Sequence, residues 1–313
     1  MPQPFAIAIH GGAGTILKHQ MSEELKLFIL EDLKKSVLAG HSILKMGGNS
    51  LNAVVEAVKV LEDSSNFNAG KGSVLTNKAT VEMDASVMCG KAMTAGAVAG
   101  VRHIKNPVML AKDVMQNSDH VLLIGEGAEE FAFENNYKYT EEEYFHTERR
   151  HKQLQYLKEK GLFTFSECEY PDDNKYGTVG AVALDQNGNL AAATSTGGVA
   201  NKKYGRVGDS ALIGSGTVAE NGNVAVSATG MGEIFIRKMV AGDVAARMRY
   251  LGEDVHTASK TIIQGDLKTI GGEGGLIAID AFGDICFAMN SSGMYRASID
   301  VKGDLNVKVY ADD

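Results

Sequence analysis

Tryptophan is absent from the 313 residues, and proline and cysteine are scarce, with four and three residues. The cysteines are Cys89, Cys168 and Cys286, and their spacing matches no zinc or redox motif. An odd number of cysteines is also a poor framework for disulfides, so we expect free thiols in a reducing compartment. The sequence therefore argues against a small disulfide-stapled fold and against a cysteine-ligated metal.

Long apolar runs and an excess of positive charge are also missing. No segment reaches the roughly 18 consecutive apolar residues of a membrane-spanning helix. The N-terminal sequence MPQPFAIAIHGG has no basic region ahead of an apolar run, unlike a secretory signal. The formal net charge of −8 argues against binding to nucleic acid or anionic membranes. We therefore expect a cytoplasmic protein that binds neither membranes nor nucleic acid.

The common signatures of cofactor chemistry do not occur. The sequence contains no G-x-G-x-x-G fingerprint, no phosphate-binding loop ending in Gly-Lys-Ser/Thr and no G-x-S-x-G nucleophile elbow. The eight histidines are scattered without metal-ligand spacing, and His10, which follows an apolar strand, is predicted to be structural. Histidine-based catalysis and zinc chemistry therefore lack support.

Glycine, by contrast, is abundant, with 36 residues that often stand in pairs typical of tight turns. Apolar periodicity predicts helices over 22–46, 50–62, 107–115, 126–134, 232–251 and 255–268. Two strand pairs, 178–196 around Asn187-Gly188 and 276–289, are typical of β-hairpins. Because hairpins outnumber βαβ crossovers, the pattern favours an α+β fold with antiparallel sheets covered by helices.

Residues 135–177 differ in character from the rest of the chain. They are rich in charge and poor in apolar periodicity, although Glu148 to Lys160 could form a solvated helix. Such a long, weakly structured stretch is usually functional or disordered, and its end is typical of a mobile linker. Regular structure resumes abruptly at Thr178.

The dipeptide Gly177-Thr178 at this boundary raises a chemical hypothesis. A threonine hydroxyl is a weak nucleophile, but the α-amino group of an N-terminal threonine can take its proton, since that amine titrates at about 7.7–8.0. Thr178 would gain such an amine only if the bond to Gly177 broke, and glycine would permit the strained backbone that this step needs. On the local pattern alone, a threonine that simply opens a strand is the alternative.

Several motifs in fixed order carry a family resemblance. They cover nearly the whole chain except about 135–175 and are His10-Gly-Gly-Ala-Gly14, Phe67-Asn-Ala-Gly70, Gly96-Ala-Val-Ala-Gly100, Asn106-Pro107, Gly125-Glu-Gly-Ala128, Gly177-Thr-Val-Gly-Ala-Val-Ala-Leu-Asp185, Ala193-Thr-Ser-Thr-Gly-Gly198 and Gly205-Arg-Val-Gly-Asp-Ser210. This set closely resembles the plant-type L-asparaginases, also called isoaspartyl (β-aspartyl) peptidases. They are threonine-type N-terminal-nucleophile hydrolases.

The resemblance implies a fold and an activity. It implies one domain over 1–313, a four-layer αββα sandwich that cleaves itself into an α subunit (1–177, with the variable linker 135–177) and a β subunit (178–313). The active unit would be a dimer of αβ heterodimers. The substrates would be L-asparagine, cleaved at its side-chain amide, and β-aspartyl dipeptides, cleaved at their isopeptide bond.

The resemblance also implies roles for individual residues around the reacting bond. Thr178 would be the nucleophile and its own amine the base, while Thr196 would orient it and assist processing. Thr229 and Gly230 would form the oxyanion hole, with donors aimed at the developing charge. Asn68 would help to position the nucleophile.

A second group of residues would bind the free amino-acid end of the substrate. Arg206 would hold its α-carboxylate, since a guanidinium matches a carboxylate in bidentate fashion. Asp209 would hold its α-ammonium, and Gly232 would add a backbone contact. The alternative for Arg206 and Asp209, three residues apart in a glycine-rich loop, is a surface ion pair.

The resemblance implies no cofactor for catalysis but a structural sodium ion. Its ligands would be the main-chain carbonyls of Leu61, Glu62, Ser64, Phe67, Ala69 and Lys71. The sequence departs from the family pattern at Ser64-Ser65-Asn66, at Cys89 and at Met231, which stands between two glycines of the oxyanion loop.

Three other functions stay open at this stage. A glycosylasparaginase acts on glycan-linked asparagine in lysosomes and needs a secretory signal. A threonine endopeptidase of the same fold would not need a pair such as Arg206 and Asp209 for a free amino-acid end. A relative that neither cleaves itself nor catalyses would only bind metabolites.

Overall fold

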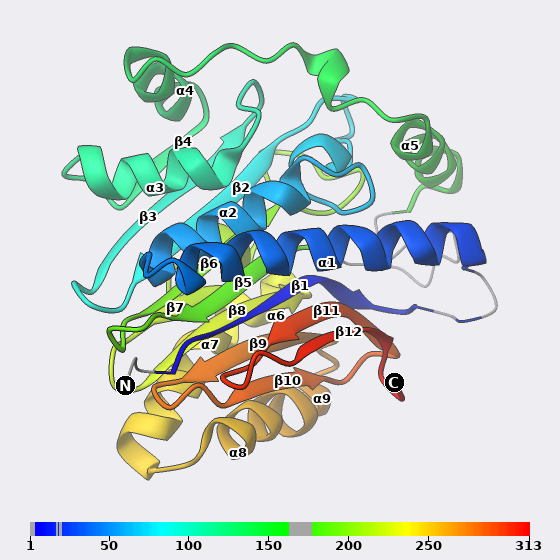
Figure 1. The fold of residues 1–313 in the computed structure, drawn as a ribbon. Coiled ribbons are helices and arrows are strands. Elements are labelled where there is room, and N and C mark those ends of the chain that lie inside the picture. The colour runs from blue at the N-terminus through cyan, green and yellow to red at the C-terminus, as the bar shows by residue number, and fades with distance from the viewer. Residues whose placement is uncertain (1–3, 17, 19–20, 163–176) are drawn as a thin grey trace.

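The structure is a computed structural model, and it describes residues 4–16, 18, 21–162 and 177–313. Two β-sheets lie face to face, and helices cover both outer faces (Figure 1). Among these residues the larger sheet has eight strands, in the spatial order β12 (Leu305–Tyr310), β11 (Gly293–Ile299), β1 (Ala6–Gly14), β5 (Val179–Leu184), β6 (Leu190–Thr196), β2 (Met83–Cys89), β3 (Thr94–Val101) and β4 (Leu122–Ile124). The predicted αββα sandwich of the α+β class is thereby confirmed.

The smaller sheet has four strands within the same described ranges, in the order β10 (Ile285–Met289), β9 (Gly274–Asp280), β8 (Val224–Gly230) and β7 (Thr217–Ala219). Neighbouring strands of both sheets are antiparallel except β3 and β4. Both predicted hairpins, β5–β6 and β9–β10, are present. The first turns at Gly188, whose φ of 75° explains why glycine stands there.

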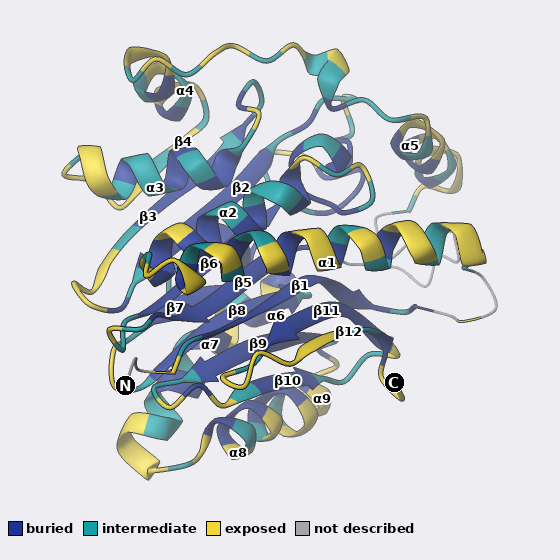
Figure 2. Ribbon diagram, viewed as in Figure 1, coloured by how far each residue is buried: buried dark blue, intermediate teal, exposed yellow. Residues whose placement is uncertain are grey.

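Three helices cover the outer face of the larger sheet: α1 (Glu23–Lys45), α2 (Ser50–Glu62) and α3 (Pro107–Asn117) (Figure 1). The Ser22 hydroxyl accepts the Leu25 amide at 3.2 Å and caps the N-terminus of α1. Figure 2 shows the buried stripe of α1 turned to the sheet and its exposed stripe turned outward. Its buried apolar residues are Ile29, Leu33, Val37 and Leu44.

The smaller sheet is covered by α6 (Gly232–Lys238), α7 (Val240–Ala246), α8 (Val255–Lys260) and α9 (Leu267–Thr269), with π-helical turns at Arg247–Leu251 and Thr261–Asp266. The sequence predicts one helix over 232–251, and this is wrong. The chain breaks at Met239, which has a left-handed φ of 48°. The break lets the Gly242 amide donate to the Gly214 carbonyl at 2.7 Å, a tertiary bond that no local pattern encodes.

Small apolar side chains fill the space between the two sheets. Ala8 and Val182 of the larger sheet and Ala225 and Ile277 of the smaller sheet are fully buried there. The inner strands β5 and β6 are consequently buried along their whole length. The start of β5 and the end of β6, where Thr178 and Thr196 lie, thus rest on a rigid support.

The segment 135–162 is packed against the sandwich in its second half. It contains a 3-10 turn, η2 (Glu142–Tyr144), and α5 (Glu148–Lys160), which has the predicted bounds. The helix is not solvated all round, because Leu154 and Leu157 are buried and Arg150 donates from Nε to the Gly72 carbonyl at 2.8 Å. The rest of the predicted linker, residues 163–176, lies outside the described residues.

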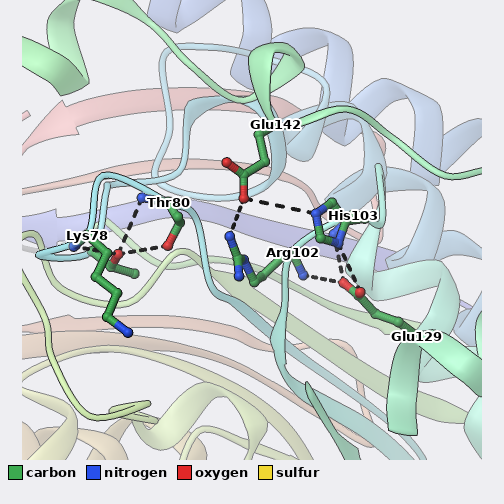
Figure 3. A network of polar contacts seen from close by, with 7 residues as sticks. Lys78, Thr80, Arg102, His103, Glu129 and Glu142 are labelled. Atoms are coloured by element: carbon green, nitrogen blue, oxygen red, sulfur yellow. Dashed lines mark hydrogen bonds and ion pairs between the residues drawn. The ribbon is translucent and has the colours of Figure 1, made fainter. Parts of the chain in front are cut away.

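Charged side chains connect this segment to α4 (Gly125–Glu134) and to the end of β3 (Figure 3). Glu129 accepts the His103 amide at 2.7 Å and lies 3.0 Å from the His103 ring. Arg102 donates to Glu142 of η2. Arg102 and His103 are adjacent and directly follow β3. Their side-chain contacts therefore hold both α4, through Glu129, and η2, through Glu142, against the end of this strand.

Candidate active site

Thr178 immediately precedes β5, and Thr196 is the last residue of the neighbouring strand β6. The antiparallel register pairs Val179 with Ser195, so the two threonines come together at the same end of the sheet. Thr178 is 7% exposed, and its Oγ1 donates to Oγ1 of Thr196 at 3.2 Å. The structure therefore brings together the predicted nucleophile and the predicted second threonine.

Gly177 is buried directly against Asn68. A Cβ added to Gly177 would stand 2.7 Å from the Asn68 Cβ, so only glycine fits without a shift of the neighbour. This close approach is a reason for glycine at position 177 that the sequence interpretation does not include. Asn68 is itself held on both sides, because its Oδ1 accepts the Val74 amide at 2.9 Å and its Nδ2 donates to the Gly198 carbonyl at 2.7 Å.

A small pocket contains most of the residues predicted for catalysis and substrate binding, but not Thr229 or Gly232. Its lining is Gly177, Thr178, Thr196, Gly198, Val199, Arg206, Gly208, Asp209, Ser210 and Gly230. A larger surface pocket lies between β10 and the β11–β12 hairpin, but none of the predicted site residues lines it. The predicted nucleophile Thr178 and the charged residues Arg206 and Asp209 thus line the same small pocket.

Asp209 lies on a 3-10 turn, η3 (Asp209–Ala211), and is only 3% exposed. Within the described part of the chain, its Oδ2 has no hydrogen-bond partner. Burial raises the pKa of this carboxyl to about 7, opposed in part by a backbone hydrogen bond and by the charge of Arg206. A buried, unpartnered carboxylate oxygen in a pocket is suited to a cationic ligand group such as an α-ammonium.

Arg206 has a carboxylate partner that the sequence interpretation missed. Its Nε and one terminal nitrogen each donate at 2.9 Å to the two carboxylate oxygens of Glu233. The alternative of an Arg206–Asp209 surface pair is therefore wrong: Arg206 pairs with Glu233, and Asp209 is buried. The only local sign of Glu233 is an acidic residue in the first turn of α6, where the helix dipole alone explains it.

The predicted oxyanion residues lie at the end of β8. Thr229 is fully buried, and its Oγ1 accepts the Ala13 amide at 3.3 Å. Since a hydroxyl accepts through lone pairs and donates one proton, this contact leaves the Thr229 proton available. Gly230 lines the pocket itself, and a Cβ there would stand 2.5 Å from the Glu273 carbonyl.

Gly232 begins α6 beside the two charged residues. A Cβ at this position would stand 2.6 Å from a terminal nitrogen of Arg206 and 3.1 Å from Oδ1 of Asp209. Met231, the N-cap residue of α6, is partly buried against the core of the outer helices. Cys89 ends β2 as a free, half-buried thiol and does not line the pocket with Thr178.

The predicted sodium loop closes tightly on itself. A Cβ at Gly70 would stand 2.3 Å from the Glu62 carbonyl oxygen, and a Cβ at Gly72 would stand 2.1 Å from that of Phe67. The carbonyls of Glu62 and Phe67 therefore pack closely against these two glycines. Carbonyl oxygens are ligands of the kind that suits a hard cation. The remaining predicted ligand positions lie in the same loop: Leu61, Ser64, Ala69 and Lys71. Among the residues that the structure describes, no cluster of three or more His, Cys, Asp or Glu side chains could hold a metal.

Known proteins resemble this chain over most of its length. The chain is 50% identical over 293 residues to an isoaspartyl peptidase of Escherichia coli (strain K12), covering 93% of this chain and 91% of that protein. It is 46% identical to a plant-type L-asparaginase of Thermococcus kodakarensis, with 93% and 95% coverage. It is 42% identical to an isoaspartyl peptidase/L-asparaginase of Xenopus laevis, with 97% and 94% coverage.

Within the described ranges, no helix is both long and apolar enough to cross a membrane. The family model for asparaginase matches residues 3–309, nearly the whole chain. Together with the relatives above, this match shows that the chain is a hydrolase that belongs to the asparaginase family.

Proposed function

We propose that this chain hydrolyses the side-chain amide of L-asparagine and the isopeptide bond of β-aspartyl dipeptides, with Thr178 as the nucleophile. The observation that carries the proposal is the contact of Thr178 Oγ1 with Thr196 Oγ1 in the pocket that also contains Arg206 and Asp209. The activities for which the relatives are named, isoaspartyl peptidase and L-asparaginase, support the same substrate class.

The substrate end of the pocket supports recognition of a free amino acid. The carboxylate of Asp209 would bind the α-ammonium group through its unpartnered Oδ2. Arg206, oriented by Glu233, would bind the α-carboxylate through its guanidinium group. An internal residue of a peptide has neither free group, so this pair favours small amino-acid substrates over an endopeptidase activity.

Maturation would supply the base. Cleavage between Gly177 and Thr178 would give an α subunit of 1–177 and a β subunit of 178–313, with the Thr178 α-amino group at a new terminus. Attack of the Thr178 hydroxyl on the Gly177 carbonyl would convert the peptide bond to an ester, which water then hydrolyses. The close packing of Gly177 on Asn68 supports a fixed position for this carbonyl.

The mature amine would then take the Thr178 hydroxyl proton while Oγ1 attacks the substrate amide carbon. Thr229, with its proton available, and the backbone at Gly230 would stabilise the oxyanion. Ammonia, or the amine of a dipeptide, leaves with that proton. Water finally hydrolyses the β-aspartyl ester and releases L-aspartate.

We also propose a structural sodium ion held by the carbonyls of the 61–71 loop, and assembly as a dimer of αβ heterodimers. The first proposal rests on the family resemblance of this loop, whose backbone folds tightly at Gly70 and Gly72. A cytoplasmic location is supported by the free thiols of Cys89 and Cys286.

Three substrates assayed side by side test the function. Wild-type protein should release ammonia from L-asparagine and leucine from β-aspartyl-leucine, and should act weakly on a glycosylated asparagine. The Thr178→Ala variant should act on none of them. Preference for the glycosylated substrate would instead indicate a glycosylasparaginase. If the wild type turns over none of the three substrates, the remaining interpretation is a non-catalytic relative that only binds metabolites.

A further inference from the structure

A connected set of buried polar side chains runs between the two sheets directly beneath Thr178. We call this set the interlayer network. Its members, in spatial order, are Ser210, Ser86, Thr217, Thr194, Ser227 and His10. None is more than 1% exposed, and five of the six are fully buried. The network uses residues from both sheets and from η3.

One end of the network contacts the side chain of Thr178. Oγ of Ser210 lies 3.4 Å from Oγ1 of Thr178. The carbonyl of Ser210 accepts the Ser86 hydroxyl of β2 at 2.6 Å, and Oγ of Ser86 lies 2.8 Å from Oγ1 of Thr217 of β7. The position of η3, and with it the hydroxyl next to Thr178, thus depends on hydroxyls in both sheets.

The other end approaches the backbone of Thr178. Thr194 Oγ1 lies 2.5 Å from Oγ1 of Thr217 and 2.7 Å from Oγ of Ser227, which lies 3.0 Å from Nε2 of His10. Burial lowers the pKa of His10 to about 3, and the backbone of Thr178 acts on the ring in the opposite direction. Nδ1 of His10 has no hydrogen-bond partner in the described part of the chain. The contact between the His10 ring and the Thr178 backbone is therefore weaker than the hydroxyl contacts of the network.

The local sequence leaves room for the network. A Cβ at Gly180 would stand 2.0 Å from Oγ of Ser227 and 2.5 Å from Nε2 of His10. Glycine two residues after Thr178 therefore permits these groups to meet. Apolar contacts also join the two sheets, as for Val182 against the smaller sheet.

Polar groups in a core contribute less to stability than well-packed apolar groups, but a fully connected set fixes one geometry. The concentration of hydroxyls at the end of the interlayer space that carries Thr178 therefore points to positioning rather than to stability. A hydroxyl whose position is fixed before the reaction does not have to be oriented during it.

We propose that the interlayer network positions Thr178 for nucleophilic attack, with Thr194 as its central positioning residue. The proposal rests on the function proposed above. Thr194 is the sharpest place to test it, because its hydroxyl contacts the hydroxyls of both Thr217 and Ser227. It lies two residues before Thr196 and does not line the pocket.

The test compares Thr194→Val, which keeps the shape but removes the hydroxyl, with Thr194→Ser, which keeps the hydroxyl. Ammonia release from L-asparagine is measured and divided by the cleaved fraction of each preparation, so that maturation does not enter kcat. The Thr194→Val variant loses the hydrogen bonds of this hydroxyl, which help to orient Thr178. Its kcat should therefore fall about five- to tenfold, while KM stays within twofold of the wild type. Thr194→Ser should keep at least half of the wild-type kcat.

The matched control is Ser36→Ala. Ser36 is also fully buried, and its hydroxyl donates to the Ala57 carbonyl at 2.8 Å, but in the helical layer away from the site. It should lose stability without losing kcat. A Thr194→Val kcat within twofold of the wild type, or an equal loss in Ser36→Ala, would overturn the proposal. If Thr194→Val does not fold, Ser86→Ala must show the same loss of kcat for the proposal to stand.

The proposed function and the proposed role of the interlayer network would be overturned by different results. An active wild type with an unaffected Thr194→Val variant removes the network's role and leaves the function intact. A wild type that releases no ammonia from L-asparagine removes the function and the network's role together.

Discussion

Glu233 binds the guanidinium of Arg206 through two parallel hydrogen bonds of 2.9 Å each. The geometry is the side-on pairing that a planar guanidinium favours. It uses Nε and one terminal nitrogen of Arg206, a residue that lines the pocket. A residue outside the predicted set therefore sets the orientation of the proposed carboxylate-binding group.

Glu233→Gln should weaken substrate binding more than catalysis. Because Arg206 would lose one charged anchor, we expect KM for L-asparagine to rise about three- to tenfold with kcat within twofold. The control is Glu253→Gln, since Glu253 holds Arg247 through the same two nitrogens at 2.8 and 2.7 Å, away from the site. An unchanged KM in Glu233→Gln, or an equal rise in the control, would remove Glu233 from substrate binding.

Affinity for the free amino-acid end should depend on the ionisation of Asp209. Burial raises the pKa of this carboxyl to about 7, so much of it is protonated at pH 6 and must lose its proton to pair with an ammonium group. The inhibition constant of L-aspartate should therefore fall as pH rises from 6 to 8, by up to about tenfold per unit below the pKa. An inhibitor is the better probe, because its binding does not require the Thr178 amine. A constant that stays level across this range would contradict the assignment.

Gly177→Ala should slow the proposed self-cleavage. The added Cβ would stand 2.7 Å from the Asn68 Cβ, and overpacking of this kind costs about 1–3 kcal/mol. We expect the half-time for appearance of the two fragments, followed by denaturing electrophoresis, to lengthen about tenfold or more. Gly127→Ala is the control, since a Cβ there has no heavy atom within 4 Å. Equal cleavage rates in the two variants would show that the contact with Asn68 is irrelevant.

His10 should make the fold sensitive to acid. Its pKa is lowered to about 3 by burial, whereas an exposed histidine titrates near 6.5. The unfolded chain therefore binds the additional proton between these values, so stability should fall as pH decreases below about 6.5. Urea unfolding of His10→Gln should show a shallower loss from pH 6.5 to 4.5 than the wild type. His120→Gln, at an exposed position, should follow the wild type, and identical slopes for all three proteins would refute the prediction.

Much of the architecture could be predicted from local pattern. The turn at Gly188, the cap at Ser22 and the bounds of α5 follow from rules that act over a few residues. The break at Met239 could not, because a non-glycine residue in a left-handed conformation is held there by contacts with a distant loop.

The candidate site shows the same division. Thr178, Thr196 and Asp209 were found from motifs, and the structure brings them into one pocket. No motif indicates Glu233, and none assigns a role to the interlayer hydroxyls, although Thr194 and Ser210 stand within motifs of the family. These residues gain a role only when segments more than twenty residues apart meet. The physical reason for Gly177 was also a tertiary one, its contact with Asn68.

The central claim is that Thr178 becomes an N-terminus and carries the reaction, and intact-mass measurement of the purified protein tests it most directly. The account predicts that the 33.3-kDa chain converts with time into two fragments, one of which begins at Thr178, while ammonia release from L-asparagine rises in parallel. The Thr178→Ala variant should remain one chain and inactive. An uncut wild type that hydrolyses asparagine at full rate, or a cut at this bond in Thr178→Ala, would contradict the account.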